Sequence, residues 1–209
     1  MSLKRPLVVG SKGNMGRRYM AILGHLGGVE PRGIDLWEVI PTDYDSVILA
    51  TPTSQHVEQI FAFEHYRVPI LCEKPISTSL ARVMGLFDKA KTRGIRLRMV
   101  NQYADIARFD PNANGPTFYD YFRHGSDGLA WDCINIIGMA KWRPTLSERS
   151  PIWSCTINGQ KLSVDTMDAA YVQMVKDWLA GGHENLDYML NAHRKVAEYI
   201  AENALCAMS

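Results

Sequence analysis

The first hundred residues alternate between short apolar runs and longer segments with apolar positions at helical spacing. Short apolar runs are typical of buried parallel strands, and apolar residues three or four positions apart are typical of amphipathic helices. This pattern predicts strands at 6–10, 33–36, 46–50, 68–72 and 95–100, and helices at 14–26, 54–65 and 79–93. Because strands that alternate with helices form a parallel, doubly wound sheet, the predicted fold class is α/β of Rossmann type.

One connection in this pattern is short. About ten residues separate the strand that ends at Leu36 from the one that follows it, whereas a strand–helix–strand unit needs roughly thirty. We therefore expect the usual second helix and third strand to be missing. This leaves a sheet in the order 2-1-3-4-5.

The pattern changes after about residue 103. Pro, Asn and Gly cluster at 110–116, where they indicate a boundary loop. Beyond it the sequence predicts a strand at 117–123, a helix at 128–139, a hairpin of strands 152–157 and 161–164 around Asn158-Gly159, and two final helices that begin at Thr166 and Asn185. We predict a dinucleotide-binding Rossmann domain at 1–103. A reduced α+β domain for substrate binding and dimerisation follows at 104–209, and its C-terminal helices are candidates for packing back on the first domain.

Composition and charge narrow the class of protein. Hydrophobic residues make up 46% of the chain and charged residues 22%, which is typical of an ordinary globular protein. A net charge of +1 gives no field that would attract nucleic acid or an anionic membrane. We find neither a signal peptide nor an apolar run of the roughly 20 residues that span a bilayer. The chain has four cysteines, Cys72, Cys133, Cys155 and Cys206, and they lack paired spacing. This predicts reduced thiols in a cytoplasmic protein, without a disulfide frame or a zinc site.

The loop after the first strand is rich in glycine. A dinucleotide pyrophosphate needs bare backbone amides and a helix N-terminus directed at it, and glycines at this point allow a tight turn and close packing. The spacing is G-x-x-G-x-x-G rather than G-x-G-x-x-G, so the signal depends on its setting between a strand and a helix. The alternative is a flexible turn. The predicted cofactor-binding residues here are Gly10, Lys12, Gly13, Asn14, Met15 and Gly16.

Asp35 stands at the end of the second predicted strand, 19 residues after Gly16. A carboxylate at this position accepts hydrogen bonds from the adenosine ribose and repels a 2′-phosphate, which favours NAD over NADP. The alternative is an aspartate that only shapes the turn. Trp37 follows closely and would either cover the adenine ring or belong to the core.

Two further motifs resemble those of a known family. Thr51-Pro-Thr-Ser-Gln-His56 follows the third strand, and Glu73-Lys74-Pro75 follows the fourth. Together with the glycine turn, these motifs make residues 6–103 similar to the glucose-fructose oxidoreductase and inositol dehydrogenase (Gfo/Idh/MocA) family. The resemblance implies an NAD-type cofactor bordered by Thr51, Pro52 and His56. It also implies that Glu73 and Lys74 lie near the nicotinamide, and that the bond before Pro75 is cis.

Lys74 has a chemical rationale of its own. Hydride transfer to or from a carbonyl carbon needs a proton donor, or at least a positive charge, at the oxygen. A lysine at the carboxyl end of a parallel strand points into the crevice where such sheets bind ligands. We therefore predict a catalytic role for Lys74; the alternative is a solvated surface cation.

The second half resembles the family less. The family has a D-x-G-x-H motif on a helix, and Asp132 falls on its aspartate position. The histidine position is Ile136, which cannot exchange a proton. Asp132 is predicted to contact substrate, and no metal site is expected. Residues that would replace the histidine are more readily explained as structural: Tyr103, Tyr119, Tyr121, His124 and Asp127.

Two functions from different classes fit these observations. The first is an NAD(P)-dependent oxidoreductase that acts on a sugar, a polyol or another small hydroxy or carbonyl compound by hydride transfer. The second is a catalytically degenerate NAD(H)-binding sensor or accessory protein, which Ile136 and the short second domain favour. A scaffold without a nucleotide is a weaker third. We expect a homodimer through the second half, because the aromatic strand at 117–123 would otherwise be an exposed edge or face.

Overall fold

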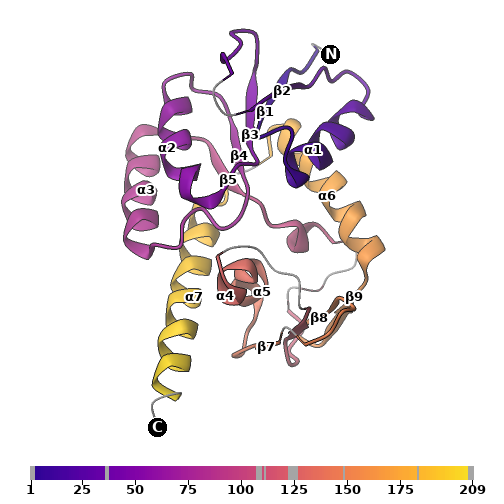
Figure 1. The fold of residues 1–209 in the computed structure, drawn as a ribbon, viewed down its shortest axis with the longest axis vertical. Coiled ribbons are helices and arrows are strands. Elements are labelled where there is room, and N and C mark those ends of the chain that lie inside the picture. The colour runs from indigo at the N-terminus through magenta and orange to yellow at the C-terminus, as the bar shows by residue number, and fades with distance from the viewer. Residues whose placement is uncertain are drawn as a thin grey trace. The chain divides into compact units, whose positions relative to one another are not determined.

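The structure of the chain is a computed structural model (Figure 1). It describes residues 3–35, 38–106, 110, 112–121, 127–147, 149–182 and 184–206. The backbone divides into two compact units. The first contains residues 1–100 and 175–186, and the second contains 101–174 and 187–209.

The first unit is built on a five-stranded parallel sheet. Its strands are β1 (Pro6–Val9), β2 (Arg32–Ile34), β3 (Ser46–Leu49), β4 (Ile70–Cys72) and β5 (Leu97–Met99). They lie in the order β2-β1-β3-β4-β5, and every neighbouring pair is parallel. This confirms the predicted class and order. Every residue of β1, β3 and β4 is buried, which explains why these strands are continuous apolar runs.

Three helices connect these strands: α1 (Asn14–Gly24), α2 (Thr53–Glu64) and α3 (Leu80–Arg93). In Figure 1, α1 lies on one side of the sheet and α2 and α3 lie on the other, as right-handed crossovers require. The Ser79 side chain caps α3 by accepting a hydrogen bond from the Arg82 amide, and Gly94 ends the helix in the left-handed conformation. Between β2 and β3, the described residues form neither a helix nor a strand.

The second unit contains a smaller mixed sheet. A 3-10 helix, η1 (Gln102–Asp105), precedes β6 (Phe118–Asp120), and β7 (Thr145–Ser147), β8 (Ser154–Ile157) and β9 (Gln160–Leu162) follow. The order is β7-β6-β8-β9. Of the two expectations for this strand, an exposed edge is wrong, because β7 pairs with β6 on one side and β8 on the other, whereas an exposed face agrees with Phe118, which is 48% exposed. The hairpin is confirmed: Asn158 and Gly159 both have positive φ, at 51° and 85°.

The helix predicted at 128–139 is two short helices, α4 (Leu129–Asp132) and α5 (Ile134–Met139). Cys133 separates them because its ψ of 14° lies well outside the helical range. The expectation of one continuous helix is therefore wrong. The D-x-G-x-H comparison, which assumed continuous helical spacing from Asp132 to Ile136, crosses this break.

Two longer helices, α6 (Val164–Leu179) and α7 (Leu186–Cys206), end the described chain. α6 begins two residues before Thr166, since the Ser163 carbonyl already accepts a hydrogen bond from the Met167 amide. Asn185 precedes α7 as predicted, but its side chain bonds to β5. Its amide nitrogen donates to the Met99 carbonyl at 2.7 Å, and its oxygen accepts from the Met99 amide at 2.8 Å. None of the helices in the described ranges is long and apolar enough to cross a membrane.

His193 lies on the buried face of α7 and is 0% exposed. Its Nδ1 lies 2.7 Å from the Met189 carbonyl oxygen, and its ring centre lies 5.8 Å from that of Trp131. Nε2 has no hydrogen-bond partner among the described residues. Burial lowers the pKa of His193 to about 4, so the neutral ring is the form that the fold accommodates.

This predicts a loss of stability in acid. Because the pKa in the folded state lies below the unfolded value of about 6.5, the unfolded chain binds more protons between these pH values. The contribution of neutral His193 to the free energy of unfolding should be complete above about pH 6.5. Between that pH and about pH 4 it should decline by roughly 1.4 kcal/mol per pH unit as the pH falls. Urea unfolding of wild type and His193→Leu at pH 7 and pH 4.5 measures it. Equal pH dependence in the two proteins would contradict the prediction.

Candidate nucleotide-binding site

The turn that follows β1 is anchored to β2. Gly10 has a φ of +83° and donates a hydrogen bond from its amide to the Ile34 carbonyl at 2.9 Å. The Ser11 amide donates to the same oxygen at 3.1 Å, and the Gly13 amide donates back to the Gly10 carbonyl at 3.1 Å. These bonds fold residues 10–13 into a tight turn that ends where α1 begins.

Glycine is required at both ends of this turn. A Cβ on Gly16 would lie 2.0 Å from the Gly10 carbonyl oxygen, and a Cβ on Gly10 would lie 2.8 Å from the Ala50 carbonyl oxygen. Gly13 occupies the N-cap of α1 and offers no side-chain cap. The first turn of α1 therefore presents backbone N–H groups and the positive end of a helix dipole, which are the features that a pyrophosphate needs.

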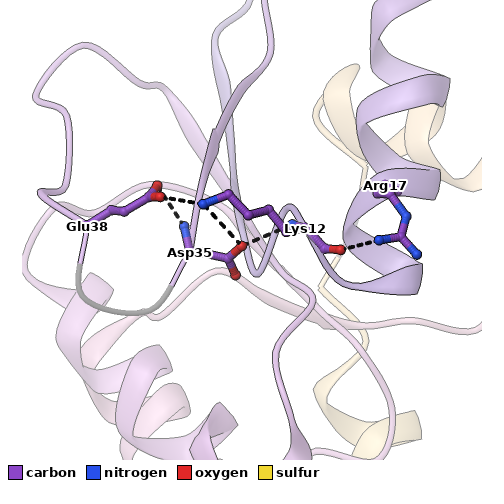
Figure 2. Close-up of polar contacts among 4 residues, drawn as sticks. All are labelled: Lys12, Arg17, Asp35 and Glu38. Carbon is purple, nitrogen blue, oxygen red and sulfur yellow. Dashed lines mark hydrogen bonds and ion pairs between the residues drawn. The ribbon is translucent and has the colours of Figure 1, made fainter.

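Asp35 lies beside this turn, as Figure 2 shows. Its Oδ2 accepts a hydrogen bond from the Lys12 amide at 3.3 Å and lies 3.9 Å from the Lys12 ammonium. The same ammonium lies 2.7 Å from Glu38 Oε1. On the other side of the turn, Arg17 donates to the Lys12 carbonyl and, at 2.6 Å, to Asn14 Oδ1. The start of α1 and the Asp35 carboxylate thus lie on either side of Lys12.

His56 ties two of the predicted motifs together. It is 1% exposed, and its Nδ1 and Nε2 each lie 2.8 Å from a carbonyl oxygen, of Pro75 and Thr51 respectively. A neutral imidazole has one N–H and donates to one of these at a time, whereas a protonated ring donates to both. With both nitrogens occupied by backbone, His56 positions the loops that border the site. Thr51 is buried and donates to Gln59, and Pro52 is exposed at the N-cap of α2.

Glu73 and Lys74 follow β4. The Glu73 side chain is 6% exposed; its Oε1 accepts a hydrogen bond from the Tyr19 hydroxyl at 2.6 Å, and its Oε2 accepts from the Lys74 amide at 3.2 Å. Lys74 is half-buried, and its bond to Pro75 is cis, as the resemblance implied. Tyr19 on α1 and the carboxylate of Glu73 thus fix the backbone from which the Lys74 side chain extends.

All these groups follow the carboxyl ends of neighbouring parallel strands. The turn at Gly10 follows β1, Asp35 follows β2, Thr51 follows β3 and Glu73 follows β4. Doubly wound sheets bind their ligands at this edge. The glycine turn, Asp35, Thr51 and Glu73 therefore lie at the same edge of this sheet.

The segment that contains most of these residues matches a known protein family. Residues 34–101 match the Gfo/Idh/MocA oxidoreductase family, a family with an NAD-binding Rossmann fold. This stretch of the chain is therefore similar to the NAD-binding part of that family. The matched residues include Asp35 and both the Thr-Pro and Glu-Lys-Pro motifs, while the glycine turn lies before the matched segment.

Curated relatives match over shorter stretches than the whole chain. Inositol 2-dehydrogenase from Mycolicibacterium smegmatis is 38% identical over 69 residues, which are 33% of this chain and 19% of the relative. Inositol 2-dehydrogenase from Rhodococcus jostii is 30% identical over 89 residues, 43% of this chain and 24% of the relative. The chain therefore spans about a fifth to a quarter of the length of these relatives.

Solved structures share the fold at low identity. A myo-inositol dehydrogenase from Corynebacterium glutamicum superposes with a TM-score of 0.76 at 13% identity, covering 96% of each chain. The WlbA dehydrogenase from Thermus thermophilus, solved with NAD and UDP-GlcNAcA, gives a TM-score of 0.63 at 15% identity over 93% of this chain and 94% of that one.

The candidates outside the Gfo/Idh/MocA motifs lie in the second unit. Asp132 is the last residue of α4, and Asp127 precedes that helix. Tyr103 is buried, and burial followed by nearby thiol and phenol groups raises its pKa well above the ordinary value. Burial likewise raises the pKa of Tyr119. Both phenols therefore stay protonated and can donate hydrogen bonds, but they are poor bases. Tyr121 follows β6, and His124 and Trp37 lie outside the described residues.

Ile136 and its neighbour Asn135 belong to the core of the second unit. Ile136 is 1% exposed. Asn135 is 2% exposed; its Nδ2 donates to Gln102 at 3.3 Å, and its Oδ1 accepts from the Tyr188 hydroxyl at 3.2 Å. Neither residue replaces the family's histidine as a proton carrier at an open surface.

Sequence reasoning missed three residues that organise the site. The Tyr19 hydroxyl on α1 donates to Glu73. Arg17 donates to two groups on the outer side of the glycine turn. Glu38 carried no signal, because its position depends on a hydrogen bond to Asp35. A polar atom on an otherwise apolar helix face was the only available clue, and it applied to Tyr19 alone.

His56→Ala tests the positioning role of this histidine. The substitution removes the donor to one carbonyl oxygen at a time and leaves a cavity where the buried ring stood, so we expect the free energy of unfolding to fall by about 2–4 kcal/mol. Urea unfolding measures this. Ser54→Ala, at an exposed position in the same helix, should change it by less than about 0.5 kcal/mol. Equal effects of the two changes would show that His56 does not stabilise the segments at Thr51 and Pro75.

Proposed function

We propose that this chain is an NAD-dependent dehydrogenase or reductase of the Gfo/Idh/MocA family. The observation that carries the proposal is the joining of the glycine turn, Asp35 and the Glu-Lys-Pro segment at one edge of one sheet. Fold alone would not support an activity, since function depends on the site. Here the glycine turn suits a pyrophosphate, Asp35 suits a ribose, and Lys74 of the Glu-Lys-Pro segment suits the reacting oxygen.

In this proposal the chain's own residues divide the work of binding. The amides at the start of α1 hold the pyrophosphate, and the Asp35 carboxylate accepts hydrogen bonds from the ribose hydroxyls. His56 keeps the Thr51 and Pro75 segments at a fixed separation. NAD, when bound, supplies a nicotinamide that accepts or donates a hydride.

Lys74 is the residue we assign to the reacting oxygen. Its ammonium stabilises negative charge there and donates the proton to the oxygen during reduction, whereas the neutral amine accepts the hydroxyl proton during oxidation. Glu73 acts as a positioning residue, because one oxygen is held by Tyr19 and the other receives the Lys74 amide. This leaves the Lys74 side chain on a rigid support, as efficient proton transfer requires.

The substrate we propose is a sugar, a polyol or another small hydroxy or carbonyl compound. The curated relatives are named inositol 2-dehydrogenases, which supports a polyol. Asp132 is our candidate for a substrate contact in the second unit. We also propose a cytoplasmic homodimer: the buried cysteines are free thiols, and the second unit exposes Phe118, Trp142, Ile152 and Val164.

A catalytically inactive NAD(H)-binding sensor or accessory protein is the second candidate. The burial of Ile136 at the family's histidine position favours it, because an apolar core residue cannot carry a proton. In that case the nucleotide edge would be retained and turnover lost.

Titration calorimetry with NADH, followed by turnover assays with NAD and a polyol panel that includes myo-inositol, tests the proposal. We expect micromolar NADH affinity in wild type. Lys74→Ala should keep this affinity within about threefold and lower kcat by about 100-fold or more. The control is Lys91→Ala, at an exposed position of α3, which should change neither quantity.

The remaining outcomes separate the candidates. NADH binding without turnover on any substrate would favour the sensor. Absence of NADH and NADPH binding by the wild-type protein would overturn both functions.

A further inference from the structure

Two charged residues beside Asp35 form a structured cluster that the nucleotide-binding motif does not require. Lys12 extends from the glycine turn, and Glu38 follows β2 (Figure 2). We infer that Glu38 is a specificity-determining residue: it holds the Lys12 ammonium away from Asp35 and thereby sets a preference for NAD(H) over NADP(H). This inference rests on the proposed nucleotide site.

Glu38 is held by two hydrogen bonds to Asp35. Its amide donates a hydrogen bond to the Asp35 carbonyl at 3.2 Å, and its Oε2 accepts one from the Asp35 amide at 3.0 Å. The other oxygen, Oε1, lies 2.7 Å from the Lys12 ammonium. The two oxygens of the Glu38 carboxylate therefore have different partners. The bond from the Asp35 amide to Oε2 orients the carboxylate so that Oε1 faces Lys12.

The Lys12 ammonium lies nearer Glu38 than Asp35. The distances are 2.7 Å to Glu38 Oε1 and 3.9 Å to Asp35 Oδ2, and the second is too long for a hydrogen bond. Asp35 Oδ2 instead receives the Lys12 amide at 3.3 Å, and no described residue donates to Oδ1. The Asp35 carboxylate thus keeps acceptor capacity for ribose hydroxyls.

The cluster carries one positive and two negative charges. The hydrogen bond between Lys12 and Glu38 raises the pKa of the lysine and lowers that of the glutamate, so both groups are charged near neutral pH. A ribose with free hydroxyls meets acceptors here. A 2′-phosphate meets a net negative charge, together with a lysine whose charge Glu38 already compensates.

Removal of the Glu38 charge should reverse this arrangement. Asp35 becomes the nearest acid to Lys12, so the ammonium moves onto the carboxylate that the ribose needs. The cluster then has no net charge, so a 2′-phosphate no longer meets a net negative charge at this place. Affinity for NADH should fall and affinity for NADPH should rise. Sequence reasoning assigned the cofactor preference to Asp35 alone, because the Lys12–Glu38 pair joins residues 26 positions apart.

A double-mutant cycle on binding tests the inference. NADH and NADPH are titrated separately into wild type, Glu38→Gln, Lys12→Met and the double variant, with calorimetry or nucleotide fluorescence as the readout. Gln at position 38 keeps an oxygen that can accept the hydrogen bond from the Asp35 amide, so this bond is preserved. Glu30→Gln, which removes a carboxylate paired with Arg5, controls for net charge.

We expect Glu38→Gln to lower the ratio of the NADPH Kd to the NADH Kd by about two- to fivefold, the range of exposed charge interactions. Lys12→Met should keep or increase that ratio, and the double variant should resemble Lys12→Met. Glu30→Gln should match wild type. Lys12→Met leaves the hydrogen bonds between Asp35 and Glu38 untouched, so it tests the inference even if Glu38→Gln unfolds.

Three results would overturn the inference. The first is NADH binding by wild type with the same ratio in Glu38→Gln. The second is the same decrease in Glu38→Gln and in the double variant, which would mean that Glu38 acts by its charge and not through Lys12. The third is a lower ratio in Lys12→Met. Failure of wild type to bind either nucleotide would overturn the proposed function as well, and the wild-type titration alone reveals it.

Discussion

The close packing of α1 against the turn that precedes it is the constraint on which the site depends. A Cβ at Gly16 would lie 2.0 Å from the Gly10 carbonyl oxygen, so the helix can begin where it does only because this residue has no side chain. That packing directs the first amides of α1 beyond the carboxyl edge of the sheet. It also sets the position of Tyr19 on α1, whose hydroxyl donates a hydrogen bond to Glu73, the residue that follows β4. One backbone contact therefore positions both ends of the proposed cofactor site.

Buried polar side chains transmit this order along the edge. His56 bridges the carbonyls of Thr51 and Pro75, and Glu73 bridges Tyr19 and the Lys74 amide. Such groups are costly to bury unless each has a partner, so a satisfied network selects one loop arrangement over many. The residues that do chemistry in our proposal, Lys74 above all, extend from loops that these side chains hold.

Charges beside the glycine turn are arranged differently. Lys12, Asp35 and Glu38 are exposed or half-buried, and each exposed pair contributes little to stability. Their arrangement has more effect on recognition, because a ribose hydroxyl and a phosphate differ by charge at the same place. Stability and specificity are thus served by separate sets of residues at one edge: buried braces for the former and an exposed charge cluster for the latter.

The sequence by itself determined the local elements and their connection. Apolar runs predicted every strand of the first sheet, and the short segment after β2 predicted the order β2-β1-β3-β4-β5, because a chain of that length cannot form another crossover. The hairpin at Asn158-Gly159 followed from residues that tolerate positive φ. The glycine turn, Asp35 and the two motifs also predicted which residues gather at the carboxyl edge.

Only the tertiary structure decided what these residues do to one another. Tyr19 with Glu73 and Lys12 with Glu38 join positions 54 and 26 residues apart, and periodicity carries no information about such pairs. The break at Cys133 and the pairing of β6 with β7 likewise depend on packing within the second unit, which overrides local propensity. Short-range pattern fixes the elements, since backbone geometry is local, whereas side-chain partners depend on the assembled fold.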